Sequence, residues 1–182
     1  RNNIELLQYN FIKILPLNFK LPSHNASWIF TSKNAVDAVY SSNEKVKCNE
    51  MPHYCVGEKT KLALVKNGQK VIKTCNNSVK LANFIINNDK NGKYVFCRGS
   101  IINKDFSDFF HTNKINLNEI AVYQTELVPE KINSTVDGIM FFSPSAIKSF
   151  MKKNTLNNSE CFCIGKTLSL IHISEPTRQF RI

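Results

Sequence analysis

The segment Trp28–Val36, WIFTSKNAV, joins an apolar run to two hydroxyl side chains and the first turn of a helical pattern. The segment Gly138–Ile147, GIMFFSPSAI, repeats this arrangement. A second apolar run ending in glycine and threonine follows each copy, YCVGEKT at Tyr54–Thr60 and CFCIGKT at Cys161–Thr167. Because the same unit occurs twice, we predict two lobes of similar architecture.

Patterns typical of buried strands alternate with amphipathic helical patterns along most of the chain. The strand patterns occupy residues 27–30, 53–56, 69–73, 93–97, 119–127, 136–142 and 161–164. The helical patterns occupy residues 33–41, 58–66, 79–87, 106–111 and 145–152. This alternation predicts an α/β protein with doubly wound parallel sheets, in which right-handed crossovers place helices on both faces.

Two alternating segments that run into proline predict how the lobes are joined. Phe11–Ile14 precedes Pro16, and Glu119–Leu127 precedes Pro129. Proline cannot donate to a strand ladder, so we expect both segments to end there. We therefore predict two small lobes joined by a two-stranded connection, with one lobe inserted into the other. The predicted domains are a discontinuous lobe of residues 1–14 plus 129–167 and an inserted lobe of residues 17–125.

The last residues do not continue the pattern. Residues 168–182 have no helical period, and the string resembles the translation of a sequencing adapter. We expect a non-native tail there, and a chain truncated at both ends. The discontinuous lobe is then expected to be too small to be stable alone.

The charge of the chain restricts its partners. A formal net charge of +10 and a pI near 9.4 call for a negative partner: nucleic acid, an anionic membrane or a polyanionic small molecule. No apolar stretch approaches the length of a membrane span. The lysines are scattered, without a motif of aromatic and basic residues for base stacking. We expect the partner to be a small polyanion, and neither a membrane nor a nucleic acid. Because charge alone does not choose among the three, nucleic-acid binding stays open as an alternative.

The cysteines and histidines do not form a recognisable reactive centre. The six cysteines contain no C-x-x-C pair and no zinc-like spacing, and four of them lie in apolar runs. We expect those four to be buried and reduced, which suits the cytoplasm. His24, His53 and His111 have no cysteine or carboxylate at a telling spacing, and no G-x-S-x-G elbow is present. No metal or cofactor is therefore expected.

Polar turns follow several of the expected strands. In doubly wound sheets, ligands bind beyond the carboxyl ends of the strands, where helix N-termini favour anions. The candidate anion-binding residues are Thr31, Ser32, Gly57, Lys59, Thr60, Arg98, Ser143, Ser145 and Thr167. Serines and threonines at helix starts are often only caps, and Arg98 is nearly as well explained by solvation. Both interpretations stay open for each residue.

At these turns the sequence resembles the uroporphyrinogen-III synthase family. The similarity runs in order from about residue 4 to residue 167. Its motifs are IFTS and AV at 29–36, YCVGEKT at 54–60, CRG at 97–99, VYQT at 122–125, FFSPS at 141–145 and CIGKT at 163–167. Where the family continues with a second threonine this chain has Leu168, and the family's first strand and last elements are missing, which puts activity of this chain in question.

The resemblance implies a cofactor-free, monomeric lyase that closes hydroxymethylbilane, a linear tetrapyrrole, into a ring with its last pyrrole inverted. The substrate's acetate and propionate groups account for a basic cleft between the lobes. The family's cleft tyrosine corresponds to Tyr123, the candidate proton donor to the leaving hydroxyl. Two alternatives stay open: Tyr123 as a packing residue between the connecting strands, and a non-enzymatic two-lobed binder of a small anion or nucleotide.

Overall fold

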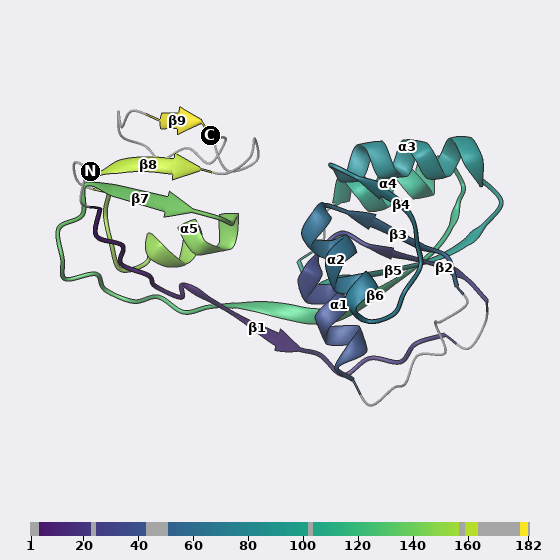
Figure 1. Ribbon diagram of the computed structural model, residues 1–182, viewed down its shortest axis with the longest axis horizontal. Coiled ribbons are helices and arrows are strands. Elements are labelled where there is room, and N and C mark those ends of the chain that lie inside the picture. The colour runs from purple at the N-terminus through teal and green to yellow at the C-terminus, as the bar shows by residue number, and fades with distance from the viewer. Residues whose placement is uncertain are drawn as a thin grey trace. The chain divides into compact units, whose positions relative to one another are not determined.

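The computed structural model describes residues 4–22, 25–42, 51–101, 104–156 and 159–163, and the backbone of 179–181. Two compact units are present, residues 14–124 and residues 1–13 with 125–182 (Figure 1). We call these the inserted unit and the discontinuous unit. The boundaries that we predicted between the lobes, near residues 14–17 and 125–129, lie within a few residues of this division, whereas the predicted end at residue 167 does not coincide with it. The standing of the two lobes as separate folding domains stays a prediction.

Fourteen elements follow one another along the described chain. The strands are β1 (Ile12–Pro16), β2 (Ser27–Phe30), β3 (His53–Val56), β4 (Val71–Cys75), β5 (Lys93–Gly99), β6 (Asn116–Leu127), β7 (Gly138–Phe141), β8 (Glu160–Cys163) and β9 (Gln179–Arg181). The helices are α1 (Lys33–Tyr40), α2 (Glu58–Lys66), α3 (Ser78–Asn88), α4 (Lys104–Thr112) and α5 (Pro144–Phe150).

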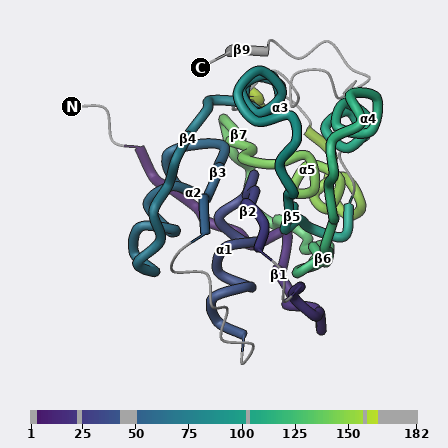
Figure 2. The backbone as a smooth tube through the Cα atoms, turned by 90° about the vertical axis from the view of Figure 1, so that its right-hand side faces the viewer, coloured from purple at the N-terminus to yellow at the C-terminus, as the bar shows by residue number. Residues whose placement is uncertain are grey.

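A six-stranded sheet in the order β1-β6-β5-β2-β3-β4 forms the centre of the inserted unit. The strands from β6 to β4 pair in parallel. Figure 2 shows β4, β3, β2, β5 and β6 side by side in this order. The parallel arrangement confirms the α/β class predicted from the alternation of strands and helices.

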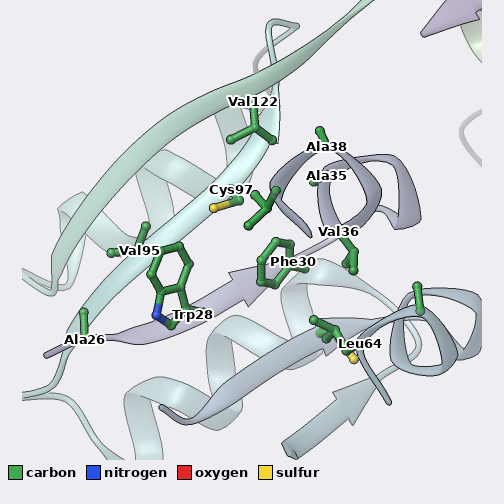
Figure 3. Close-up of a cluster of buried hydrophobic side chains, with 13 residues drawn as sticks. Ala26, Trp28, Phe30, Ala35, Val36, Ala38, Leu64, Val95, Cys97 and Val122 are labelled. Atoms are coloured by element: carbon green, nitrogen blue, oxygen red, sulfur yellow. The ribbon is translucent and has the colours of Figure 1, made fainter. Parts of the chain in front are cut away.

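Helices cover both faces of this sheet. On one face, α1 packs over β2 and β5 and α2 packs over β3 and β4, around a cluster that includes Trp28, Phe30 and Leu64 (Figure 3). On the other face, α3 and α4 pack around a second cluster that includes Leu81 and Phe110. Burying a large aliphatic or aromatic side chain of this kind contributes about 1.5–3 kcal/mol, so these two clusters hold the layers together. The doubly wound prediction is therefore confirmed for this unit.

Two antiparallel strands, β1 and the second half of β6, form the connection. The N–H of Leu17 donates to the carbonyl of Val122 at 3.0 Å, and that of Val128 donates to Phe11 at 2.9 Å. The residue number rises from 11 to 17 along one strand while its partner's falls from 128 to 122, so the two strands run antiparallel. Pro16 is the last residue of β1, so this strand ends at the proline as predicted. Because β1 is the edge strand of the sheet, the missing N–H of proline costs no ladder bond.

The discontinuous unit has a smaller parallel sheet in the order β7-β8-β9. Helix α5 packs against this sheet through Ile147 and Phe150, which lie in one buried cluster with Phe141 of β7. Among the described residues of this unit, α5 is the one helix that covers the sheet. The strand β9 lies in the tail that we expected to take no part in the fold. An exposed edge strand accepts an extended segment through main-chain hydrogen bonds, which depend little on side chains.

Candidate functional site at the carboxyl ends of the strands

The register of the inserted unit brings three of the predicted turns to one edge of its sheet. Phe30 of β2 lies level with Cys55 of β3 and Cys97 of β5. The next residues along these parallel strands therefore emerge together at the carboxyl edge. Thr31 comes directly after β2, Gly57 comes directly after β3, and Arg98 is the second-last residue of β5. The sheet thus gathers these turns from three neighbouring strands.

Ser32 is the N-cap of α1. It has an extended backbone, and its Oγ accepts a hydrogen bond from the N–H of Asn34 at 3.1 Å. This bond satisfies one of the amide groups that a helix start leaves without an intrahelical partner. Thr31 and Ser32 are both half-buried. The side chain of Ser32 is thus used as a cap, while the first turn of α1 keeps the partial positive charge of a helix N-terminus.

The three predicted residues in and after the turn that follows β3 differ in how accessible they are. Gly57 has φ of 83°, a backbone conformation that favours glycine, and its N–H donates to Cys75 at 2.9 Å. Lys59 is exposed and Thr60 is buried. Among these three, Lys59 is therefore the side chain that solvent and a ligand can reach.

Arg98 makes two contacts at the end of β5. Its Nε donates to Oε2 of Glu119 at 2.7 Å, and its Nη1 donates to the carbonyl of Gly99 at 2.9 Å. The Arg98 and Glu119 side chains are only 16% and 15% exposed, so solvent screens this ion pair less than a surface pair. The guanidinium thus has a protein carboxylate as a partner, where we expected a substrate carboxylate.

Tyr123 lies at the same edge, against the backbone of β5. Gly99 pairs with Tyr123 in the sheet, and a Cβ built on Gly99 would lie 2.9 Å from Cζ of the tyrosine ring. The N–H of Ser100 donates to the carbonyl of Tyr123 at 2.8 Å. The ring is half-buried and packs beside the cluster around Phe30. The phenol is therefore fixed at one side while part of it stays accessible.

The discontinuous unit carries Ser143 and Ser145 at the carboxyl end of β7. Ser143 is the N-cap of α5, and its Oγ accepts a hydrogen bond from the N–H of Ala146 at 3.1 Å. Both serines are half-buried. Thr167 lies outside the described residues. The expected meeting of turns from both units in one cleft stays a prediction.

Sequence reasoning missed the partners of Arg98 and His53. Glu119 stands 21 positions from Arg98, and only the pairing of β5 with β6 joins them. His53 is fully buried; its Nδ1 lies 2.9 Å from the carbonyl of Met51, and its Nε2 lies 2.9 Å from the hydroxyl of Tyr40. The carbonyl can only accept, so Nδ1 donates and the neutral ring accepts from Tyr40 at Nε2. In both cases the side chains that pair are too far apart in the sequence for their spacing to indicate the contact.

The cysteines that the structure describes are buried, as predicted for the four in apolar runs. Burial and the neighbouring Cys163 raise the pKa of the Cys161 thiol to about 11, and burial raises the pKa of Cys55. Such thiols are poor nucleophiles at neutral pH because the thiolate is the reactive form. Within the described residues, no group of three or more metal-ligating side chains could hold a metal ion. None of the described helices is long and apolar enough to cross a membrane.

A solvent-accessible pocket of about 700 Å³ lies in the discontinuous unit. Its lining includes Asp137 and Glu160, at the amino ends of β7 and β8. This is the opposite end of the strands from Ser143. The pocket is therefore separate from the predicted anion-binding turns of the same unit.

This fold is similar to that of solved uroporphyrinogen-III synthase structures. The uroporphyrinogen-III synthetase from Helicobacter pylori 26695 aligns with a TM-score of 0.75 and 20% identity, over 93% of this chain and 83% of that one. A mutant uroporphyrinogen III synthase from the extremely thermophilic bacterium Thermus thermophilus aligns with a TM-score of 0.59 and 10% identity, over 85% and 73%. The sequence has no significant match among curated proteins.

The family comparison covers most of the sequence. The model described as uroporphyrinogen-III synthase HemD matches residues 4–170, which include the inserted unit, α5 and β8. This range also contains every turn at which the sequence resembled the family. The chain therefore belongs to the uroporphyrinogen-III synthase family.

Proposed function

We propose that this chain cyclises hydroxymethylbilane to uroporphyrinogen III, with loss of water and inversion of the last pyrrole ring. Its family consists of lyase-type cyclases of tetrapyrrole and heme biosynthesis. The match over residues 4–170 is the observation that carries the proposal. The fold shared with two synthases supports it, and no finding favours a non-enzymatic binder of a small anion or nucleotide.

The substrate is a flexible polyacid, and the chain offers several groups for its carboxylates. In the inserted unit these are Thr31, Ser32 and the first turn of α1, the backbone at Gly57, and Lys59 on α2, whereas the Thr60 side chain is buried. In the discontinuous unit they are Ser143, Ser145 and Thr167. A net charge of +10 favours approach of the polyacid from solution. Cytoplasmic, monomeric action without a cofactor completes the proposal.

Tyr123 is the proposed proton donor. Its hydroxyl protonates the substrate's leaving hydroxyl, which departs as water while the electron-rich pyrrole supplies the electrons for C–O cleavage. The substituted carbon of the last pyrrole then attacks to form a spiro intermediate. Its original bond to the bridging methylene breaks and re-forms at the free α-carbon of the same ring, and the proton lost from that carbon restores the phenol. The bilane also closes unaided to the uninverted isomer, so the protein acts mainly by holding the chain for the inverting attack. The accessible side of the Tyr123 ring supports this role.

Incubation of the chain with hydroxymethylbilane, followed by oxidation and separation of the uroporphyrin isomers, tests the proposal. The expected product is isomer III, formed faster than the spontaneous closure measured without protein. Heat-denatured protein serves as the control, since it keeps the charge and composition but loses the fold. Isomer I alone, formed at the spontaneous rate, overturns the proposed function. The binder alternative gains support if the folded protein binds a nucleotide tightly while closure of the bilane is unaffected.

A further inference from the structure

The pairing of β5 with β6 changes register immediately before Tyr123. Arg98 lies opposite Ala121, whereas the next residue, Gly99, lies opposite Tyr123. Val122 is therefore an extra residue in β6, the arrangement of a β-bulge. Bulges bend a strand locally and redirect the side chains that follow. The position of Tyr123 is thus set by a local departure from regular pairing.

The bulge changes the face to which Tyr123 belongs. Neighbouring residues of a regular strand point to opposite faces of the sheet. Here Val122 is fully buried in the cluster around Phe30, and Tyr123 packs against the same cluster. The strand therefore delivers two successive side chains to the face covered by α1 and α2.

Gly99 provides the surface on which the Tyr123 ring rests. A Cβ on Gly99 would lie 2.9 Å from Cζ, 3.0 Å from Cε2 and 3.1 Å from the hydroxyl oxygen of Tyr123. Observed Cβ atoms essentially never approach within 3.0 Å, so any side chain at this position displaces the ring. Because the contact involves the hydroxyl end of the ring, the displacement moves the phenol oxygen itself.

The ion pair of Arg98 and Glu119 holds the same strand ends together. Glu119 lies on β6 four residues before Tyr123, and Arg98 adjoins Gly99 on β5. Through its two hydrogen bonds, the guanidinium ties the Glu119 carboxylate to the carbonyl of Gly99. His111 is a further neighbour, with Nε2 4.0 Å from Oε1 of Glu119, but its side chain is 66% exposed. The pair therefore fixes the register on the amino side of the bulge.

We propose that Gly99 and the Arg98–Glu119 ion pair are positioning residues that set the Tyr123 hydroxyl for the cyclisation. Gly99 leaves room for the ring, and the ion pair maintains the bulged register that turns the ring onto Gly99. The proposal rests on the proposed function of Tyr123. It assigns Arg98 to the support of Tyr123 and not to a substrate carboxylate.

Gly99→Ala tests whether the absence of a side chain at this position sets the place of the Tyr123 ring. We expect kcat to fall by a factor similar to that of Tyr123→Phe, with KM changed less than threefold. In the double variant G99A/Y123F, kcat should be no lower than in Y123F, because the hydroxyl that Gly99 positions is already gone. Losses that multiply in the double variant contradict the proposal, since independent effects add in free energy.

Gly138→Ala is the matched control. A Cβ on Gly138 would lie 3.0 Å from Cε2 of Phe162, so this glycine also supports an aromatic ring on a strand, with no catalytic group involved. We expect kcat within twofold of the unmodified chain. In protein labelled with fluorotyrosine, the ¹⁹F resonance of Tyr123, assigned through Y123F, should shift in G99A and stay in place in G138A. An unmoved resonance in G99A overturns the proposal whether or not the chain is active.

Arg98→Lys and Glu119→Gln separate positioning from direct binding of substrate. Lysine keeps the charge but cannot donate to Glu119 and Gly99 in the same fork geometry. In the positioning role both variants lower kcat and leave KM little changed, and His111→Gln leaves both constants unchanged. If Arg98 instead binds a substrate carboxylate, Glu119→Gln frees the guanidinium and lowers KM, which overturns the proposal. A chain that forms isomer III while G99A and R98K keep full kcat refutes only this inference; a chain that forms none refutes the proposed function.

Discussion

His53 is a buried titratable residue that the proposed chemistry does not use. Its ring stacks on Phe30 with the centroids 6.1 Å apart, and burial lowers its pKa from 6.5 to about 4, against a smaller opposing effect of the hydrogen bond to Met51. The unfolded chain therefore binds the His53 proton more strongly than the folded chain. Its contribution to stability is present above pH 6.5 and is lost as the pH falls towards 4.

We expect His53 to make the free energy of unfolding decrease by about 2 kcal/mol between pH 7 and pH 5, since one pKa unit corresponds to about 1.4 kcal/mol. Urea unfolding at the two pH values measures this difference. His53→Gln, which cannot titrate, should be less stable at pH 7 but lose most of the decrease. His111→Gln, at an exposed position, should keep it. An equal decrease in the chain and in His53→Gln counts against the buried histidine as the cause.

Tyr123→Phe removes the proposed proton donor and leaves the ring. We expect kcat to fall by about 100-fold, at the lower end of general acid catalysis, because the pyrrole already assists departure of the hydroxyl. Steady-state rates of bilane consumption measure the effect. Tyr9→Phe is the control, since Tyr9 belongs to the core beside Phe11 and takes no part in the proposed site. Unchanged kcat in Tyr123→Phe would return Tyr123 to the alternative role of a packing residue.

At the scale of elements, the start of α1 combines a structural and a proposed binding role. The Oγ of Ser32 caps the helix, and the same turn is proposed to bind a substrate carboxylate. A substitution that keeps the cap while changing the charge can separate the two roles, because aspartate caps helices as well as serine does.

Ser32→Ala should lower the free energy of unfolding by about 1 kcal/mol through loss of the cap. Ser32→Asp should keep that stability, yet raise KM for the bilane at least tenfold, because a carboxylate at the helix start repels the carboxylates of the substrate. Asn77→Asp is the matched control: Asn77 caps α3, which follows the edge strand β4 two strands away from β2. Equal KM values for Ser32→Asp and Asn77→Asp would remove Ser32 from the binding site.

At the scale of the whole molecule, the two units differ in how much core they bury. The inserted unit has clusters of buried residues on both faces of its sheet, whereas seven buried residues form the one cluster described in the discontinuous unit. Small cores supply little net stability against the entropy of ordering the chain. The discontinuous unit should therefore open more easily than the inserted unit.

Native-state hydrogen exchange on the full chain tests this difference. The slowest amides of β2, β3 and β5 should be protected at least tenfold more than those of β7 and β8, since exchange reports the free energy of local opening. Amides of β6 provide an internal comparison because this strand contributes to both units. Equal protection in β7 and β5 would show that the two units unfold together.

The sequence by itself determined the order of strands and helices, because apolar periodicity and capping residues act over a few neighbouring positions. Local patterns placed helix starts at the hydroxyl-bearing turns around Ser32 and Ser143, and the family resemblance named Tyr123 as a site candidate. Only the tertiary structure decided that Arg98 pairs with Glu119 and that Tyr123 rests on Gly99. Both contacts depend on which strands become neighbours and in which register. A bulge of one residue in β6 sets the register at Tyr123, and it has no local signature in the sequence.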